Sequence, residues 1–482
     1  MTRIPGFIGP TYSLQSVSAD CQRCVNLFPQ LSEIGPSENG EIGVLMRTPG
    51  LTLLGTIGTG PIRGLYVASN GNLYCVSGNG LYQVSSSWVG TRLGTLYSTS
   101  GRVEFIDNGV QMVLTDGQGY LLTFATNVLL PLVGVTGWMG SNCAAYLDEW
   151  GIFAVPGSNA FYTSNQLDLG TYNGLNVSYK QGFGDPIVSV IVDKATIWLL
   201  GRETSEPWYN AGNPSPGIVF SRVPNALIDI GCCSPHSPQK VLNNGIIFLG
   251  DGKHGAGIVW QIQGYAPSRI STHAVEQALQ SYGYANLQNA TAWTYQQDGH
   301  GFYALNVPGA PVTWVYDVTS KAWHERAHLV LGLDFRHQAD CHAWFNGQHV
   351  VGDYQTGLLY ALDKANYTDN GSPLRWLRRS PHITANLNRM VFNSFQLDLE
   401  TGMATDTGQG SNPVVMLRYS DDAGHTWSGG VSRPAGNIGG YLGRAKWQQL
   451  GQSRNRVFEV SGSDPVATVI LGADLIVTPC AS

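Results

Sequence analysis

The sequence is poor in charged residues and has no long uninterrupted apolar run. Asp, Glu, Lys and Arg make up only 12% of its 482 residues, about half of the usual share. Disordered chains need high charge and few aromatic residues, so this composition excludes that class. No apolar run approaches the roughly 18 residues of a membrane-spanning helix, so we expect no membrane partner.

Basic clusters and a secretory signal are also missing. The formal net charge is −6, and no strongly basic patch is visible in the sequence. Broad wrapping of nucleic acid depends on Lys and Arg at the phosphates, so this composition argues against it. Residues 1–10 lack a basic segment followed by an apolar one, so we expect no signal peptide.

Cysteines are few and do not follow a metal-ligand spacing. The groups that lie close in sequence are Cys21 with Cys24, Cys232 and Cys233 with His236, and Cys341 with His342. A structural zinc site needs four ligands at recognised spacings, and none of these groups supplies them. We therefore predict no metal site and no cofactor. We expect the eight cysteines to be buried thiols of a chain made in a reducing cytosol.

Glycine and aromatic residues are abundant, with 60 Gly, 13 Trp and 22 Tyr. They predict an all-β protein with many tight turns and a large core. The segment Leu65–Val84 shows the pattern most clearly, because Asn-Gly pairs at Asn70 and Asn79 join its short apolar runs. Asn and Gly accept the positive φ angles that two-residue hairpin turns require.

The same hairpin pattern returns along residues 61–365. It recurs, with variation, in Val103–Phe124, Ala144–Tyr162, Ile187–Tyr209, Val241–Ile262, Ala292–Tyr316 and Ala343–Leu362. The repeats start roughly 40 to 50 residues apart, which is the period of β-propeller blades. We predict a propeller of seven blades, with six as the alternative because the fourth and fifth repeats contain extra residues.

The rest of the chain lacks this period. Residues 1–60 predict an extended N-terminal lead-in that partly completes the propeller, and residues 366–387 predict a linker. Residues 388–482 contain longer alternating segments, such as Met390–Leu399. They predict a separate C-terminal β-sandwich domain.

Two segments interrupt the repeats. Tyr209–Pro238 contains five prolines and predicts a long surface loop. Ser271–Asn286 has apolar residues at helical spacing after the capping residue Thr272, and predicts a helix of about four turns. Neither segment serves the repeat, so both are candidates for contacts with neighbouring proteins. The candidate contact residues are Tyr209, Asn213, Ser271, Glu276 and Gln280.

The sharpest local motif lies at residues 420–427 and resembles the Asp-box, Ser-x-Asp-x-Gly-x-Thr-Trp, of β-propeller hairpins. Its residues are Ser420, Asp422, Gly424, Thr426 and Trp427. The carboxylate of an Asp-box bonds turn amides, the glycine permits the bend, and the Trp packs beneath it. We therefore predict a structural staple without catalytic chemistry.

Acidic residues do not form a recognisable catalytic set. The candidates are Asp148, Glu149, Asp251, Asp298 and Asp340. Most of them lie at expected turns, where Asp is common for backbone reasons. We therefore predict no enzymatic activity. Two alternative functions stay open, a carbohydrate-binding or receptor-binding propeller module and a sialidase-like glycoside hydrolase.

Several stretches, taken in order, resemble one known family. They are Val25–Pro29 with Arg47–Leu51, then Arg63–Tyr66 with Leu73–Val76 and Gly80–Tyr82, then Ile270–Tyr282, and finally Ser420–Gly424. Over nearly its whole length the chain resembles the tail hub or nozzle proteins of short-tailed phages, which are also called packaged DNA stabilisation proteins.

The resemblance implies a structural protein of the virion, located in the phage tail and made in the cytoplasm of the bacterial host. It implies a homo-oligomer, a hexameric ring below the portal and adaptor proteins, with a tail needle, tailspike or fibre proteins as further neighbours. It also implies retention of packaged DNA, conduction of DNA during ejection, and no catalytic residue. Six copies at −6 each would form an acidic ring, so we expect DNA to pass through the channel without tight binding.

Overall fold

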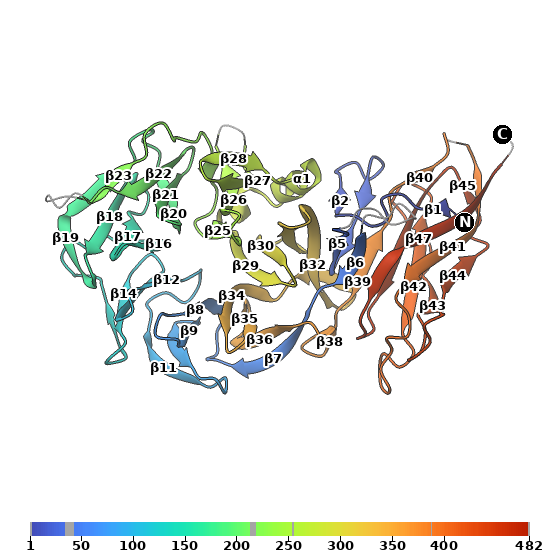
Figure 1. Ribbon diagram of the computed structural model, residues 1–482, viewed down its shortest axis with the longest axis horizontal. Helices are drawn as coiled ribbons and strands as arrows, with labels where there is room; N and C mark the ends of the chain where they lie inside the picture. Colours follow the sequence, from blue (N-terminus) through green and yellow to red (C-terminus); the bar gives the residue numbers. More distant parts are fainter. Residues whose placement is uncertain (1, 34–42, 213–217, 253–254, 387, 481–482) are drawn as a thin grey trace.

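Two β-rich halves lie side by side along the long axis of the molecule (Figure 1). A computed structural model describes residues 2–33, 43–212, 218–252, 255–386 and 388–480. Strands coloured from blue through green to gold form a propeller, and the orange and red C-terminal strands form a sandwich beside it. The all-β class and this two-part architecture are therefore confirmed.

The first four repeats each form a four-stranded antiparallel sheet whose strands follow one another along the chain. They are β8 (Ile62–Val67), β9 (Leu73–Ser77), β10 (Gly80–Val84) and β11 (Gly90–Thr95); β12 (Glu104–Asp107), β13 (Gln111–Thr115), β14 (Tyr120–Thr123) and β15 (Val128–Pro131); β16 (Ala144–Leu147), β17 (Trp150–Ala154), β18 (Ala160–Asn165) and β19 (Asp168–Tyr179); and β20 (Ile187–Asp193), β21 (Thr196–Gly201), β22 (Ser205–Asn210) and β23 (Phe220–Arg222). The first strands of neighbouring sheets pack together, as β12 does with β16 and β16 with β20.

The fifth sheet has a divided first strand. Its strands are β24 (Gly231–Cys232), β25 (Gln239–Lys240), β26 (Ile246–Asp251), β27 (Ile258–Gln263) and β28 (Ala266–Arg269). Both β24 and β25 pair with β26, and the chain between them bends away from the sheet.

The sixth repeat belongs to a larger sheet. Its strands are β29 (Thr291–Gln297), β30 (His300–Asn306), β31 (Thr313–Asp317), β32 (Ala322–Val330) and β33 (Leu333–Arg336). Strand β32 also pairs with β4 (Cys24–Val25), through which an 11-stranded sheet continues into the sandwich. Six sheets thus belong to the propeller alone. Strands β29 to β32 form a further set of four strands whose sheet continues into the sandwich. The propeller has seven blades when this set is counted and six when it is left out.

The last sheet closes the propeller with a strand of the N-terminal lead-in. Its strands are β34 (Ala339–Phe345), β35 (Gln348–Asp353), β36 (Leu358–Asp363) and β7 (Gly50–Thr56), extended by β37 (Thr368–Asp369) and β38 (Ser372–Pro373). Strand β7 pairs antiparallel with β36, placing Leu51 opposite Leu362. Strand β34 packs against β8 of the first sheet, so the two ends of the repeat region meet.

Tight turns connect neighbouring strands at the Asn-Gly pairs, with three residues in the loop at Asn70 and two at Asn346. In the turn between β8 and β9, Gly71 has a φ of 80°, and Oδ1 of the Asn70 side chain accepts from Asn72 N at 3.0 Å. Between β34 and β35, both Asn346 and Gly347 have positive φ angles, 51° and 74°. These conformations match the right-handed twist of the flanking strands, which explains why these residue types occur there.

The sandwich contains strands from both ends of the chain. One sheet consists of β44 (Ala445–Gln448), β41 (Met390–Leu399), β47 (Val469–Pro479), β6 (Gly43–Arg47) and β5 (Leu27–Leu31), with β1 (Thr2–Arg3) and β45 (Gln452–Ser453) at its sides. The facing part of the 11-stranded sheet consists of β4, β39 (Trp376–Arg379), β46 (Asn455–Gly462), β42 (Val414–Ser420) and β43 (Val431–Pro434), with β40 (Ile383–Thr384) beside β46. Buried Leu45, Phe395, Phe458 and Leu475 share one core between these sheets.

This arrangement differs from a separate C-terminal domain joined by a linker. Residues 1–60 supply β1, β5 and β6 to the sandwich as well as β7 to the propeller, and a further small sheet of β2 (Tyr12–Ser13) and β3 (Cys21–Gln22). Residues 366–387, expected as a linker, contain the short strands β37 to β40. These four strands are only two to four residues long, and β37, β39 and β40 pair with distant segments. Alternation along the sequence could therefore not reveal them.

The helical segment is broken into two helices, α1 (His273–Ser281) and α2 (Tyr284–Gln288), instead of one helix of four turns. Gly283 between them has a φ of 86°, which an α-helix cannot contain. Thr272 caps α1 as predicted, its side chain accepting from Val275 N. Among the described residues, no helix is long and apolar enough to cross a membrane.

The segment Tyr209–Pro238 is not a simple surface loop. It contains the end of β22, the outer strand β23 and the inner strand β24, and Phe220, Cys232 and Cys233 are buried. The segment's prolines among the described residues, Pro224, Pro235 and Pro238, lie outside these short strands, so they do not interrupt their ladders.

Candidate functional site: the propeller–sandwich junction

Strand β4 joins the two halves of the molecule. It pairs in parallel with β32 of the propeller, Val25 opposite Glu325, and antiparallel with β39, Val25 opposite Leu377. Val25 and Leu377 are buried in the same apolar cluster as Val275 of α1. The sheet, the cluster and the helix therefore form one continuous structure across the junction.

Asn26 extends this connection with its side chain. Its Nδ2 donates to the carbonyl oxygens of Ala327 at 2.9 Å and Arg375 at 2.7 Å, and its Oδ1 accepts from Ala327 N at 3.0 Å. Its φ of 51° turns the chain out of β4, a conformation that Asn tolerates better than most residues. One buried side chain thus links β32 to the segment before β39.

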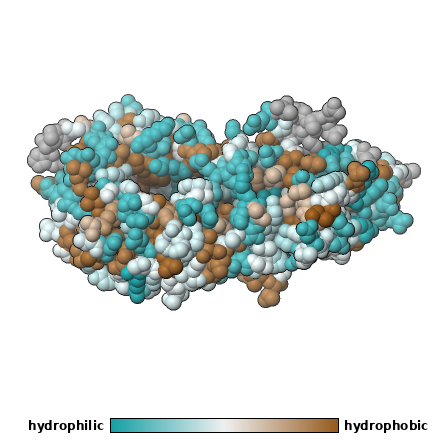
Figure 2. All heavy atoms as spheres, turned by 60° about the horizontal axis from the view of Figure 1, so that its bottom comes forward, coloured by the Kyte–Doolittle hydropathy of each residue, from teal (hydrophilic) through white to brown (hydrophobic). Residues whose placement is uncertain are grey.

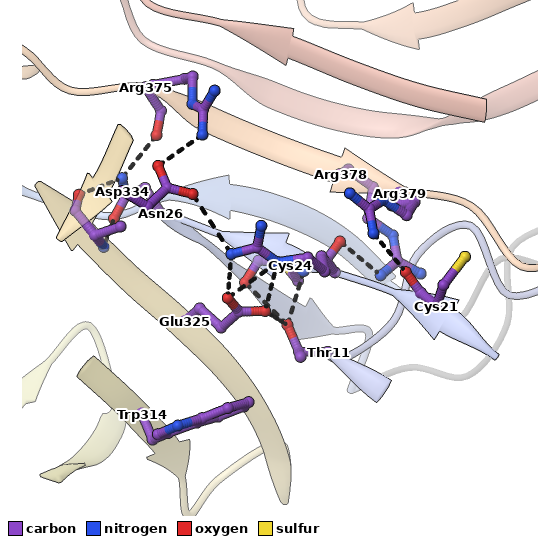
Figure 3. Close-up of polar contacts among 12 residues, drawn as sticks. Thr11, Cys21, Cys24, Asn26, Trp314, Glu325, Asp334, Arg375, Arg378 and Arg379 are labelled. Carbon is purple, nitrogen blue, oxygen red and sulfur yellow. Dashed lines mark hydrogen bonds and ion pairs between the residues drawn. The ribbon is translucent and has the colours of Figure 1, made fainter. Parts of the chain in front are cut away.

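Ion pairs surround this connection. Arg23 donates from Nε and Nη2 to the Glu325 carboxylate, with Nη2 2.5 Å from Oε2, and lies 3.5 Å from Asp334. Asp334 also accepts from Arg375 at 2.6 Å, and Thr11 donates to Glu325 at 3.2 Å (Figure 3). Burial alone would lower the pKa of Arg23, but the Glu325 and Asp334 carboxylates outweigh it and raise that pKa.

Arg378 on β39 holds the beginning of the chain in place. Its guanidinium is fully buried and donates to the carbonyl oxygens of Gly6 at 2.9 Å, Phe7 at 2.6 Å and Pro10 at 2.9 Å, and to Gln22 at 2.8 Å. Burial lowers the pKa of Arg378, and the nearby Cys24 thiol and Asp20 carboxylate offset only part of this desolvation.

Glu459 on β46 binds two further arginines. Arg379 donates to Oε2 at 2.7 Å and Arg418 to Oε1 at 2.5 Å. Burial raises the pKa of Glu459, but the two arginines outweigh it and keep that pKa below its usual value. The ring of Trp427 lies 4.5 Å and 5.0 Å from the guanidinium carbons of Arg379 and Arg418.

The Asp-box turn has the hydrogen bonds that its sequence predicts. Asp422 accepts from Thr426 N at 2.8 Å, from Thr426 Oγ1 at 2.6 Å and from Ser420 Oγ at 2.7 Å. Gly424 N donates to Ser420 Oγ at 2.8 Å. Hydrogen bonds from Thr426 and Ser420 lower the pKa of Asp422 well below its usual value.

The position of Trp427 differs from the prediction. It is only half-buried and stacks against two arginines, whereas we expected it to pack beneath the turn. A Cβ at Gly424 would lie 3.1 Å from Cys21 Sγ, and His425 Nε2 lies 3.3 Å from Ser18 Oγ. The motif therefore secures the N-terminal lead-in to the sandwich.

The cysteine groups lie apart from one another and bond other residues. Cys24 Sγ donates to Leu27 O at 3.3 Å, whereas Cys21 Sγ faces His382 at 3.8 Å. His236 pairs with Glu104 at 2.8 Å, and His342 pairs with His349 at 3.0 Å. Among the described residues, no group of three or more His, Cys, Asp or Glu side chains is placed to hold a metal ion.

The five acidic candidates serve separate structural contacts. Asp148 accepts from Asn210 at 3.1 Å, Glu149 from Gln166 at 2.7 Å, Asp251 from Tyr284, Asp298 from Lys364 at 2.6 Å, and Asp340 from Arg336 at 2.6 Å. Asp148 and Glu149 share the turn between β16 and β17, whereas the other three belong to three different sheets, so the five do not form one catalytic set.

The candidate contact residues divide into accessible and enclosed ones. Tyr209 is 42% exposed and Gln280 is exposed on α1, whereas Ser271 and Glu276 are buried and bond each other at 2.6 Å. Glu276 also pairs with Arg269. It therefore stabilises the start of α1 and is not available to contact a neighbouring protein. Asn213 lies outside the described residues.

The propeller encloses a cavity of about 820 Å³ on its axis. The first strands of five sheets line it, and Arg102, Glu104, Asp107 and Lys240 contribute charge. A cavity of this size suits a small ligand, and it is too small for a macromolecule to thread.

Family models match almost the whole chain. The model described as bacteriophage P22 Gp10, beta-propeller, matches residues 20–367, and the model described as bacteriophage P22 Gp10, beta-sandwich, matches residues 375–478. The chain belongs to the bacteriophage P22 Gp10 family. The resemblance seen in the sequence is thereby confirmed, and the chain is a structural component of a phage tail, located in the virion.

Solved propellers share little of the sequence. The extracellular domain of the putative hybrid two component system BT4673 from B. thetaiotaomicron is 11% identical, with a TM-score of 0.44 over 79% of this chain, which spans 47% of that chain. The WD40 beta propeller domain of Doa1 is 10% identical, with a TM-score of 0.41 over 65% of this chain and 97% of its own. No curated protein matches the sequence.

Sequence reasoning missed most of the junction. Arg375, Arg378 and Arg379 lie within residues 366–387, which were predicted as a linker, and no sequence pattern connected them to Glu325 or Glu459. The sequence signal was the segment Val25–Pro29 in the family resemblance, because the partners are far apart in the sequence, by 41 residues in Arg375 with Asp334 and by 349 residues in Asn26 with Arg375.

Proposed function

We propose that this Gp10-family protein is the ring-forming hub or nozzle of a short tail, a hexamer that retains packaged DNA and conducts it during ejection. The observation that carries the proposal is the junction at β4, where one sheet runs through both halves of the chain. A ring under the pressure of packaged DNA needs subunits that keep their shape, and a sheet whose backbone hydrogen bonds continue through both halves supports that rigidity.

Two exposed apolar groups on different halves support assembly into a ring. On the β32–β33 hairpin, Leu331 is 99% exposed and Leu333 is 66% exposed, while Tyr441 and Leu442 on the sandwich are 72% and 96% exposed. Figure 2 shows such hydrophobic patches on both halves of the visible face. Two different patches on one chain suit a head-to-tail interface, which closes into a ring.

DNA would pass through the middle of the ring and not through the propeller, because the propeller cavity is only about 820 Å³. The proposed neighbours are the portal and adaptor proteins above, and a tail needle with tailspike or fibre proteins below and around. Tyr209 and Gln280 remain candidate contacts, since both are accessible. We propose no enzymatic role, because the acidic candidates serve separate structural contacts.

Assembly with the neighbouring proteins tests the proposal. The purified chain is mixed with the portal and adaptor proteins of the same phage, and the complex is weighed by native mass spectrometry. We expect six copies bound to the adaptor ring. Leu331→Asp and Leu442→Asp should reduce the copies bound, whereas the control Val89→Asp, at a residue that is 63% exposed, should not. Failure of the wild-type chain to join the adaptor would contradict the proposal.

A further inference from the structure

Three hairpins of the propeller gather around one exposed tryptophan. They are the turns that follow β25, β29 and β34, the first strands of neighbouring sheets, which lie next to one another in Figure 1. Trp344, near the end of β34, has 56% of its surface exposed. A large exposed aromatic side chain on a rigid hairpin is a typical feature of a binding surface.

Trp344 is held in place by a row of aromatic rings. Its ring meets His349, its partner across the hairpin, edge to face at 4.5 Å. His349 contacts His342 at 5.2 Å, and His342 stacks on the buried Trp293 at 6.1 Å. This row extends from the core to the surface, so the orientation of Trp344 is set before any ligand arrives.

Two hollows meet at this tryptophan. One, of about 510 Å³, is lined by Lys240, Leu242 and Thr294, and the other, of about 610 Å³, by Asp298, Gln348 and Lys364. Gln296, Trp344 and His349 line both hollows. Each volume lies within the range of small-ligand pockets, so the surface can hold at least two linked units of a chain-like ligand.

The polar groups of the hollows are mostly neutral and available. Among the described residues, the side-chain amides of Gln296 and Gln348 make no hydrogen bond within the chain, so each can both donate and accept. The exposed ion pair of Asp298 with Lys364, 2.6 Å apart, adds a carboxylate and an amine of opposite charge at one rim. The surface therefore combines a flat aromatic plate with hydroxyl-binding groups and has no concentration of one charge.

We propose that these hollows bind an oligosaccharide, with one sugar ring stacked on Trp344 and the next units reaching the amides on either side. A pyranose has an apolar C–H face and a rim of hydroxyls, which matches an aromatic plate between amide and carboxylate groups. The mixed polarity and the absence of a concentrated charge favour a glycan over a nucleic acid. The proposal does not depend on assembly of the ring, since all of these residues belong to one chain.

Binding of the full-length chain to a printed array of bacterial surface oligosaccharides tests the proposal, followed by titration of the strongest glycan. We expect at least one glycan to bind with a Kd below about 1 mM. Trp344→Ala should weaken binding at least tenfold and Trp344→Phe should weaken it less. The control Tyr97→Ala, which removes a 68% exposed aromatic in the loop between β11 and β12, should leave binding unchanged.

A second readout keeps the test independent of folding. The chain is labelled with 5-fluorotryptophan, and the resonance missing in Trp344→Phe identifies Trp344. In the titration, this resonance should shift before those of the buried tryptophans Trp198, Trp208 and Trp447. An array with no bound glycan would overturn the proposal, and so would binding that Trp344→Ala leaves unchanged.

Discussion

At the scale of single residues, buried and partly buried arginines connect the N-terminal lead-in to both halves of the molecule. Arg23 reaches Glu325 of the propeller, Arg378 holds carbonyl oxygens of the first ten residues, and Arg379 binds Glu459 of the sandwich. A buried pair contributes little when compared with an apolar replacement, but the loss of one partner leaves an uncompensated charge. These residues therefore make the junction intolerant of single substitutions.

Glu459 links stability to pH. Since the folded-state pKa of Glu459 is depressed, its contribution is fully present above the unfolded pKa, near 4.3, and is lost as the pH falls through the folded value. Glu459→Gln should lower the free energy of unfolding at pH 7 by about 3 kcal/mol. The difference from wild type should shrink below about pH 4, as measured by urea unfolding. Glu149→Gln, at an exposed carboxylate, serves as the control and should show neither effect.

Trp427 tests the structural interpretation of the Asp-box. Trp427→Ala removes two cation–π contacts and should cost about 1–2 kcal/mol of stability, measured by thermal and urea unfolding. Trp427→Phe should recover part of this loss, because a phenyl ring still faces the two guanidiniums. Full stability in Trp427→Ala, together with loss of a binding activity, would show that the motif serves recognition.

At the scale of elements, hairpins were predictable and the strands that join distant segments were not. The Asn-Gly pairs at Asn70 and Asn346 predicted the turns, because the positive φ angles found at Gly71, Asn346 and Gly347 restrict the choice of residue. The two-residue strand β4 has no period to detect. Gly283, with its positive φ, ends α1 where the apolar spacing predicted that the helix would continue. The spacing of apolar residues does not reveal a positive φ, so the break could not be predicted from it.

Asn26 is the most direct test of the element that joins the halves. Asn26→Ala removes the side-chain bonds to Ala327 and Arg375 and leaves their buried backbone groups unpaired, at a cost of about 3 kcal/mol. Hydrogen exchange should become faster in β4, β32 and β39 than in the outer blades. Asn127→Ala provides a matched control, because Asn127 has a similar φ of 53° on the surface. An equal loss of stability in Asn26→Ala and Asn127→Ala would mean that the positive φ, and not the side-chain hydrogen bonds of the junction, accounts for the destabilisation.

At the scale of the whole molecule, sequence and structure agree on the propeller and the sandwich and differ on how they are joined. The period of the repeats revealed one half, and the change of strand length revealed the other. The sharing of the first sixty residues between both halves depends on pairings such as that of Leu51 with Leu362, at opposite ends of the repeat region. No local pattern encodes such a pairing.

The charge of the whole molecule predicts weak contact with DNA. With a net charge of −6 per copy, a ring of copies should repel the phosphate backbone. In a gel-shift titration with duplex DNA at near-physiological salt, we expect no binding below about 1 μM. Submicromolar binding that weakens steeply with added salt would contradict passive conduction and would indicate basic clamps in the channel.

The central claim is that this chain forms the DNA-conducting ring of the tail, and electron cryomicroscopy of the virion tests it most directly. The chain, fitted as one rigid unit through the β4 junction, should occupy density repeated six times around the tail axis below the adaptor, with DNA or a needle in the lumen. Density for the chain only at peripheral spikes or fibres, or two halves that fit only when separated, would contradict the account.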